Sequence, residues 1–187
     1  MKIEVRQAAE ADLPAIRNLS RYYIYELNSA CGLDVPEDGQ YDICHEVAEY
    51  WRPRHPDTQD QYRWEDPAWR GFPFALRVDG ALAGFALVQR INSSSPWIYR
   101  MGQFFVCRTY QRRGVGRRAT HRLFDRFAGH WQIETMGANR SAQRFWRRAT
   151  EGYAPRAEET PYGVTRLYFD TFKTVPDDNQ DRPSNER

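Results

Sequence analysis

A glycine-containing turn between an apolar strand and a helix is the part of this sequence with the clearest chemistry. Phe104, Phe105 and Val106 end a predicted strand, and the run Gln111-Arg112-Arg113-Gly114-Val115-Gly116-Arg117 follows. Backbone N–H groups at the start of a helix have no partner within it, so they can bind a phosphate that glycine allows to approach closely. Arginine side chains add attraction for an anion. The turn is therefore predicted to bind a phosphate or diphosphate.

The spacing of this turn differs from two common phosphate-binding motifs. A dinucleotide-binding fingerprint needs three glycines early in a βαβ unit, and a P-loop needs Lys and then Ser or Thr after its last glycine. Here Gly116 is followed by Arg117 and Arg118. An ordinary glycine loop before an arginine-rich surface helix is the alternative that these residues alone leave open.

Two blocks resemble the GNAT superfamily of acyl-CoA-dependent N-acyltransferases. Residues 111–116 match its signature Gln/Arg-x-x-Gly-x-Gly/Ala, and residues 139–146 resemble its later helix, in which Asn is followed three residues on by Ala and then by an apolar–aromatic pair. The pattern from Arg6 to Leu19 is similar to the family's first strand and helix, so the resemblance covers most of residues 1–173. Residues 31–70 have no counterpart and are expected to form a variable segment on the acceptor side.

The resemblance implies a single-domain α/β (α+β) fold with a mixed central sheet of six to seven strands, about four flanking helices and splayed central strands. It implies acetyl-CoA as acyl donor, no metal, and direct attack by a primary amine on the thioester. Phe104, Phe105 and Val106 would contact pantetheine, residues 111–117 would hold the diphosphate, Asn139 would bond the pantetheine arm, and Trp146 would pack near the thioester.

The catalytic groups are where the sequence departs from that family. Many relatives have Tyr at the position of Trp146, and an indole is no useful proton donor to a thiolate. Tyr153 is the nearest substitute. The central strand offers Gln103 in place of a carboxylate, which suggests that Gln103 positions a water, and Glu134 on the adjacent strand is the candidate general base. A surface ion pair is the alternative role for Glu134.

Apolar periodicity predicts alternating strands and helices that position these residues. Asp79-Gly80 is a strong hairpin signal between two alternating apolar runs, and Val115, Ala119, Leu123 and Phe127 predict a helix after the glycine turn. The predicted strands span residues 2–6, 74–78, 82–88, 97–106, 131–136 and 162–172, and further helices span 10–29 and 140–151. The polar, proline-containing residues 174–187 are predicted to be a disordered tail.

Charge is unevenly distributed along a chain whose net charge is only +2. Residues 103–153 contain eleven arginines and three acids, whereas residues 32–69 contain ten acids and three arginines. The first segment suits an anionic donor such as coenzyme A, and the second suits a small cationic amine. Cys31, Cys44 and Cys107 lack metal-ligand spacing, and the N-terminus has no signal peptide, so a cytoplasmic protein without metal or membrane contact is expected.

Three functional interpretations remain open from the sequence. The first is an N-acetyltransferase acting on a small amine, or on a protein or peptide amine. The second is a non-catalytic acyl-CoA-binding module that has lost its proton-transfer groups. The third is a nucleic-acid-binding protein, which the low net charge and the absence of a recognised binding motif disfavour. A homodimer through the C-terminal strands is a further expectation from the resemblance.

Overall fold

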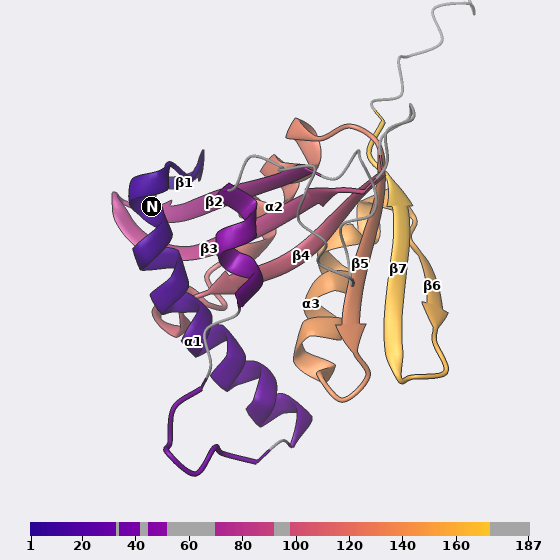
Figure 1. Ribbon diagram of the computed structural model, residues 1–187. Helices are drawn as coiled ribbons and strands as arrows, with labels where there is room; N and C mark the ends of the chain where they lie inside the picture. Colours follow the sequence, from indigo (N-terminus) through magenta and orange to yellow (C-terminus); the bar gives the residue numbers. More distant parts are fainter. Residues whose placement is uncertain (33, 42–44, 52–69, 92–97, 173–187) are drawn as a thin grey trace, which may run out of the picture.

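The computed structural model of the chain describes residues 1–32, 34–41, 45–51, 70–91 and 98–172 (Figure 1). The predicted tail at 174–187 lies outside the described residues, as does much of the predicted variable segment at 31–70. Within the described ranges, every helix is too short or too polar to span a lipid bilayer.

A seven-stranded mixed sheet forms the centre of the molecule, as predicted. Its order is β1-β2-β3-β4-β5-β7-β6, and neighbouring strands are antiparallel except β4 and β5, which are parallel. The strands are β1 (Ile3–Gln7), β2 (Arg70–Val78), β3 (Ala81–Arg90), β4 (Ile98–Val106), β5 (His130–Met136), β6 (Arg156–Glu159) and β7 (Val164–Asp170).

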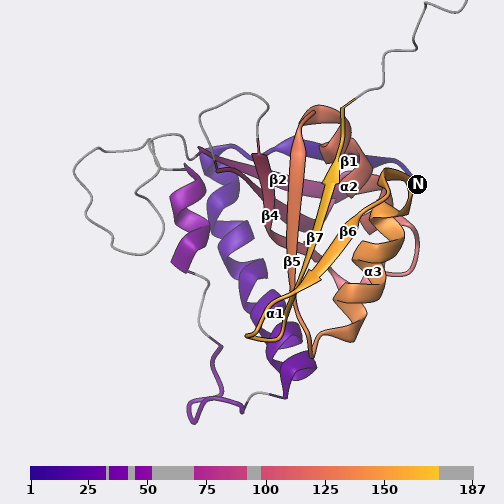
Figure 2. The ribbon, with the colours of Figure 1, turned by 90° about the vertical axis from the view of Figure 1, so that its right-hand side faces the viewer.

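Three α-helices occur in the described part of the chain, one fewer than the predicted four or so. They are α1 (Leu13–Cys31), α2 (Val115–Arg126) and α3 (Arg140–Thr150). Short 3-10 helices accompany them at η1 (Glu10–Asp12), η2 (His45–Trp51), η3 (Arg108–Tyr110) and η4 (Glu151–Tyr153). Figures 1 and 2 show α1 on one face of the sheet and α2 and α3 on the other.

Each face of the sheet has its own apolar core. On the α1 face, Ile16 packs with Phe85, Leu87 and Phe105. On the opposite face, side chains of α2 and α3 pack with Trp131 of β5 and its neighbours. These two packed layers fix the sheet between α1 and the α2–α3 pair, because burying apolar surface on both faces is the main stabilising contribution.

Several predicted element boundaries differ from the structure, β2 for example beginning at Arg70 instead of residue 74, and a predicted helix start and a missed strand have clear physical reasons. The helix expected from residue 10 begins as η1 and becomes α-helical at Leu13, with Pro14 in its first turn. The last predicted strand does not close the sheet, because β6 pairs along the outer side of β7. β6 has the sequence Arg-Ala-Glu-Glu and is exposed throughout, so it lacks the apolar alternation by which a strand is recognised.

The central strands β4 and β5 separate, as the resemblance implied. They pair from Ile98 opposite His130 to Met101 opposite Ile133. Beyond that point β4 continues to Val106 and β5 to Met136 without pairing to each other. The separation begins beside an irregularity in β4, where the register with β3 passes from Met101 to Gln103 and skips Gly102. Backbone groups on the facing edges of both strands therefore become available to a ligand.

Candidate active site

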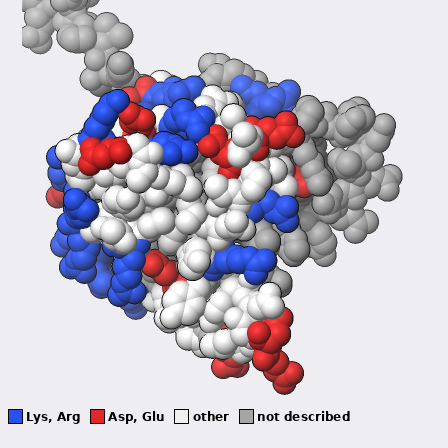
Figure 3. Space-filling view, turned by 90° about the vertical axis from the view of Figure 1, so that its left-hand side faces the viewer, with Lys and Arg blue, Asp and Glu red and all other residues white. Residues whose placement is uncertain are grey.

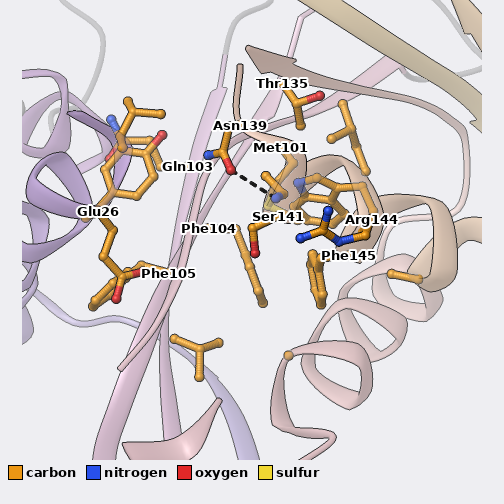
Figure 4. Close-up of a pocket in the computed structure, with 18 of the residues that line it drawn as sticks. Glu26, Met101, Gln103, Phe104, Phe105, Thr135, Asn139, Ser141, Arg144 and Phe145 are labelled. Carbon is orange, nitrogen blue, oxygen red and sulfur yellow. Dashed lines mark hydrogen bonds between the residues drawn. The ribbon is translucent and has the colours of Figure 1, made fainter. Parts of the chain in front are cut away.

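A pocket of about 750 Å³ occupies the space opened by the separation of β4 and β5 (Figure 4). Its lining comes from the diverging ends of both strands, the turn before α2 and the start of that helix, one side of α3, and one side of α1. Because α1 and α3 lie on opposite faces of the sheet, the pocket is open to groups from both faces. This is the geometry expected for two reactants that meet between the strands.

The glycine turn forms one end of the pocket. Arg112 and Gly114 both have left-handed backbone conformations, with φ of 58° and 78°, and Gly114 is the N-cap of α2. The first helical hydrogen bond runs from Arg118 N–H to Gly114 O at 3.1 Å. The N–H groups of Val115, Gly116 and Arg117 precede that bond, so they are the helix donors without an intrahelical acceptor. They can bind a phosphate at this end of the pocket.

A glycine is needed at position 116 because an aromatic ring of α3 packs against the backbone there. A Cβ at this position would lie 3.0 Å from Cε2 and 3.2 Å from Cζ of Phe145. No heavy atom lies within 4 Å of a Cβ built at Gly114, so Gly114 is required by its φ alone. The two glycines thus serve different needs, backbone conformation at Gly114 and close packing at Gly116.

Gln111 links the turn to the end of β4. Its Nε2 donates to the carbonyl oxygen of Val106 at 2.8 Å, and the two carboxylate oxygens of Glu26 lie 3.3 and 3.4 Å from the same nitrogen. The predicted role of Gln111 in holding the diphosphate is therefore indirect in this geometry: its side chain fixes the start of the turn. Burial, with a further contribution from the Glu26 charge, raises the pKa of the nearby Cys107 thiol.

Aromatic residues form the wall of the pocket on the α3 face. The rings of Phe104 and Phe145 are stacked with centroids 5.6 Å apart, and Trp146 packs edge-on against Phe104 at 5.4 Å. Phe105, the next residue of β4, lies on the other face, where it packs with Ile16 and Phe85. Of the two neighbouring phenylalanines, only Phe104 therefore presents its ring to the α3 side. Val106 is buried in a third apolar cluster.

Asn139 is the N-cap of α3. Its Oδ1 accepts the backbone N–H of Ala142 at 3.0 Å, the dashed bond in Figure 4. Asn139 lines the pocket, and its side-chain oxygen is occupied by the cap, so its Nδ2 is the group that can reach a ligand. The predicted contact with a pantetheine arm is compatible with this second group.

Gln103 and Glu134 lie on the α1 side of the separated strands. Both line the pocket, and both alternate with residues of the core packed on α2 and α3. Glu134 Oε1 accepts from Arg166 Nε at 2.7 Å and from Gln132 Nε2 at 2.8 Å. Both bonds fall on the same oxygen, which leaves Oε2 of Glu134 without a hydrogen bond among the described residues.

Three predicted site residues, Arg113, Val115 and Tyr153, are not among those that line the pocket. Arg113 is exposed, and the side chain of Val115 is buried in an apolar cluster. The ring of Tyr153 packs against Phe124 and Phe169 in the apolar core. It is absent from the pocket lining, and burial together with the charge of Asp125 raises its pKa. The sequence match places Tyr153 just after α3, where its side chain serves the core.

Several pocket residues were not found from the sequence. Ser141 and Arg144 come from the first turns of α3, and Glu26 comes from α1. Glu26 lies three residues after Tyr23, which packs towards Phe85 of the sheet. The sequence signal that could have identified Glu26 is its position one turn after Tyr23, because an acid at that spacing lies on the side of the helix that faces the sheet. Among the described residues, no group of three potential metal ligands was found.

The sequence and the structure were compared with known protein families and solved structures, and both comparisons found acetyltransferases. A family model described as the acetyltransferase (GNAT) family matches residues 40–150. The N-acetyltransferase PaiA from Thermoplasma acidophilum, solved in complex with coenzyme A, has a TM-score of 0.60 at 11% identity, covering 91% of this chain and 99% of that one. No curated protein matches the sequence significantly.

Two further solved structures are similar. The ribosomal-protein-S18-alanine N-acetyltransferase from Escherichia coli has a TM-score of 0.57 at 15% identity, covering 94% of this chain and 98% of that chain. The Salmonella typhimurium protein YncA, solved with its cofactor acetyl-CoA, has a TM-score of 0.54 at 14% identity, covering 96% of this chain and 99% of that chain. At such identities these structures establish a shared fold.

Proposed function

The chain belongs to the GNAT family of acetyltransferases, and we propose that it transfers an acetyl group from acetyl-CoA to a primary amine of a small, cationic molecule by direct attack. The observation that supports this most strongly is the pocket between β4 and β5, which has the glycine turn at one end and is open to both faces of the sheet. Donor and acceptor can therefore enter from different sides.

The residues around the pocket fit coenzyme A. The N–H groups at the start of α2 that lack an intrahelical acceptor suit the diphosphate, and Arg112 and Arg117 line the same pocket. The β4 edge beyond Met101 offers backbone donors and acceptors for amide groups of pantetheine, and Asn139 Nδ2 lies on the same side of the pocket. When bound, acetyl-CoA supplies the activated thioester carbonyl.

Transfer then depends on groups of this chain at the point where the strands separate. A backbone N–H of β4 would stabilise the negative charge that develops on the thioester oxygen. Glu134 is placed to take a proton from the attacking amine, directly or through a water held by Gln103, at its Oε2 oxygen. Because Tyr153 does not line the pocket, its hydroxyl is not the proton donor, and we propose that solvent protonates the departing thiolate.

The first experiment is calorimetric titration with acetyl-CoA, coenzyme A and an adenine dinucleotide. We expect micromolar affinity for the two coenzyme A species and none for the dinucleotide. In Gly116→Val the affinity for coenzyme A should fall about tenfold or more, because added methyl groups meet Phe145 and displace the turn. Gly152→Val is the matched control, since open space surrounds a Cβ there and Gly152 is outside the pocket.

Turnover distinguishes an enzyme from a binding module. Release of free coenzyme A thiol, measured with small amines and with peptides as acceptors, should be fastest with small cationic amines. Binding without turnover for any amine would indicate a non-catalytic module, and turnover with peptides alone would replace the small-molecule proposal. Unchanged coenzyme A affinity in a folded Gly116→Val variant would contradict the assignment of the phosphate turn.

A further inference from the structure

The charges around the pocket are divided between its two sides. Its described arginines, Arg112, Arg117, Arg144 and Arg148, come from the turn, α2 and α3. Its two described acids, Glu26 and Glu134, lie on the side of α1. Figure 4 shows this division at the level of β4, with Glu26 on one side of the strand and Arg144 on the other. A positively charged acceptor is therefore favoured on the α1 side.

The two acids differ in how far the protein already neutralises them. Glu134 is held by Arg166 at 2.7 Å and by Gln132. Among the described residues, Glu26 has no ion pair, and Gln111 is its only hydrogen-bond partner. That bond is long: Gln111 Nε2 lies 3.3 and 3.4 Å from the two carboxylate oxygens of Glu26 but 2.8 Å from the carbonyl oxygen of Val106. The Glu26 carboxylate is half-buried and faces a pocket. Such a carboxylate gains most from a cationic ligand.

The position of Glu26 along β4 sets where that cation would lie. Through Gln111, its carboxylate is linked to Val106, three residues beyond Gln103 on the strand. A strand advances about 3.3 Å per residue, so Glu26 lies on the order of 10 Å along β4 from the level of Gln103. The reacting amine belongs near Gln103 and Glu134, where the strands have just separated. Glu26 is therefore too far along to bind the attacking nitrogen itself.

We propose that Glu26 binds a second cationic group of the acceptor, so that the preferred substrates are molecules with two amines on the order of 10 Å apart. This inference rests on the proposed acetyl transfer. The remote amine stays protonated and forms a charge-assisted hydrogen bond with Glu26, while the other amine, deprotonated, attacks the thioester. The side chain of Tyr23, one turn earlier on α1, lines the same part of the pocket and can contact the apolar chain between the two amines.

The test compares unbranched aliphatic diamines of increasing length with the monoamine of each same carbon chain. In the unmodified protein, KM should be lower for longer diamines than for matched monoamines. In Glu26→Gln, KM for the best diamine should rise about five- to tenfold, because the half-buried ion pair between Glu26 and the second amine is lost. KM for monoamines, which have no second amine, should change little. Glu151→Gln, an exposed acid outside the pocket, is the matched control.

A second measurement separates this inference from the proposed reaction. The diamine is titrated calorimetrically into the protein saturated with coenzyme A, where no transfer can occur. Glu26-dependent binding in this titration, together with no acetylation of the same diamine when acetyl-CoA is supplied, would support the inference and contradict the proposed reaction. The inference is overturned if diamines bind no better than monoamines, if Glu26→Gln affects both equally, or if Glu26→Gln chiefly weakens coenzyme A, which would assign Glu26 to holding Gln111 and the turn.

Discussion

Glu134 has both of its hydrogen bonds on one carboxylate oxygen, and this determines what it can do in the reaction. Arg166 lies directly opposite Glu134 in the β5–β7 register, and its pKa is raised by the hydrogen bond and charge of Glu134. The pairing keeps the carboxylate in place at the edge of the pocket. Because Oε2 has no hydrogen bond among the described residues, an ion-paired Glu134 can orient an amine or accept its proton there.

We predict that Glu134→Gln lowers kcat about a hundredfold, because general-base catalysis typically contributes that much. The pH dependence of kcat/KM should also change, because the residue proposed to accept the proton of the amine is lost. Stopped-flow or thiol-release kinetics across pH measure both. Glu158→Gln is the control, because Glu158 faces the same Arg166 from β6 and is not in the pocket. An unchanged pH profile in Glu134→Gln would remove it from the mechanism.

The role of a residue could be predicted from the sequence where it depends on backbone conformation, but not where it depends on the direction in which the side chain points. The turn from Gln111 to Arg117 was identified because its glycines occur at a fixed spacing before a helix. Tyr153 was placed near the site by its distance in sequence from Trp146, yet η4 turns its ring into the core. Glu26 was missed because its contact with Gln111 spans 85 residues, which no local pattern records.

Among the elements, α1 is positioned by a cluster of hydrogen bonds around Asp12. The carboxylate accepts two bonds from Arg6 Nη2, at 2.7 and 2.8 Å, and one from the Ala9 N–H at 2.8 Å. Burial raises the pKa of Asp12, but the Ala9 N–H and the Arg6 guanidinium outweigh it, so that the pKa lies below its usual value. These bonds connect β1 to the start of the helix that presents Tyr23 and Glu26 to the pocket.

Asp12→Asn should lower the free energy of unfolding at neutral pH by about 1 to 2 kcal/mol, because charge-assisted hydrogen bonds are lost. A carboxyl group with a lowered pKa in the folded state contributes stability above its unfolded pKa, and that contribution is lost as the pH falls through the folded value. The variant should therefore lose less stability than the parent below about pH 4. Urea unfolding at several pH values tests this, with the exposed Asp34→Asn as control. Parallel pH curves for Asp12→Asn and the parent would contradict it.

The order of elements was largely predictable because most of them alternate or repeat with a clear period. Phe74, Leu76 and Val78 alternate up to Asp79-Gly80, and the hairpin of β2 and β3 follows as expected. β6 was missed because its side chains are all exposed, so only hydrogen bonding to β7 defines it. The separation of β4 and β5 was expected from a family resemblance, because no change of periodicity after Met101 in β4 or after Ile133 in β5 marks where their pairing ends.

At the scale of the whole molecule, the net charge conceals a strong local asymmetry. The chain carries only +2, but eleven arginines occur between residues 103 and 153, on and around α2 and α3. Figure 3 shows a group of Lys and Arg at the left edge of the face in view and acidic side chains at the lower tip, while charges of both signs alternate in the upper part. Only some of these arginines line the pocket. The others act on a charged ligand through the field that they create around the pocket entrance.

We predict that Arg118→Gln combined with Arg147→Gln slows coenzyme A association about two- to threefold at low salt, because exposed charges beside a site steer the ligand without contacting it. Both residues are exposed and outside the pocket, so the dissociation rate should not change. Stopped-flow association rates should converge for variant and parent near 1 M salt, where the screening length is about 3 Å.

Arg17→Gln combined with Arg156→Gln is the matched control for this variant. It removes the same net charge from exposed positions on α1 and β6, away from α2 and α3. If steering depends on where the arginines lie, the control should keep the parent association rate at every salt concentration. Equal slowing in both double variants would show that net charge alone governs the encounter, and a faster dissociation rate in Arg118→Gln/Arg147→Gln would instead indicate direct contact with the ligand.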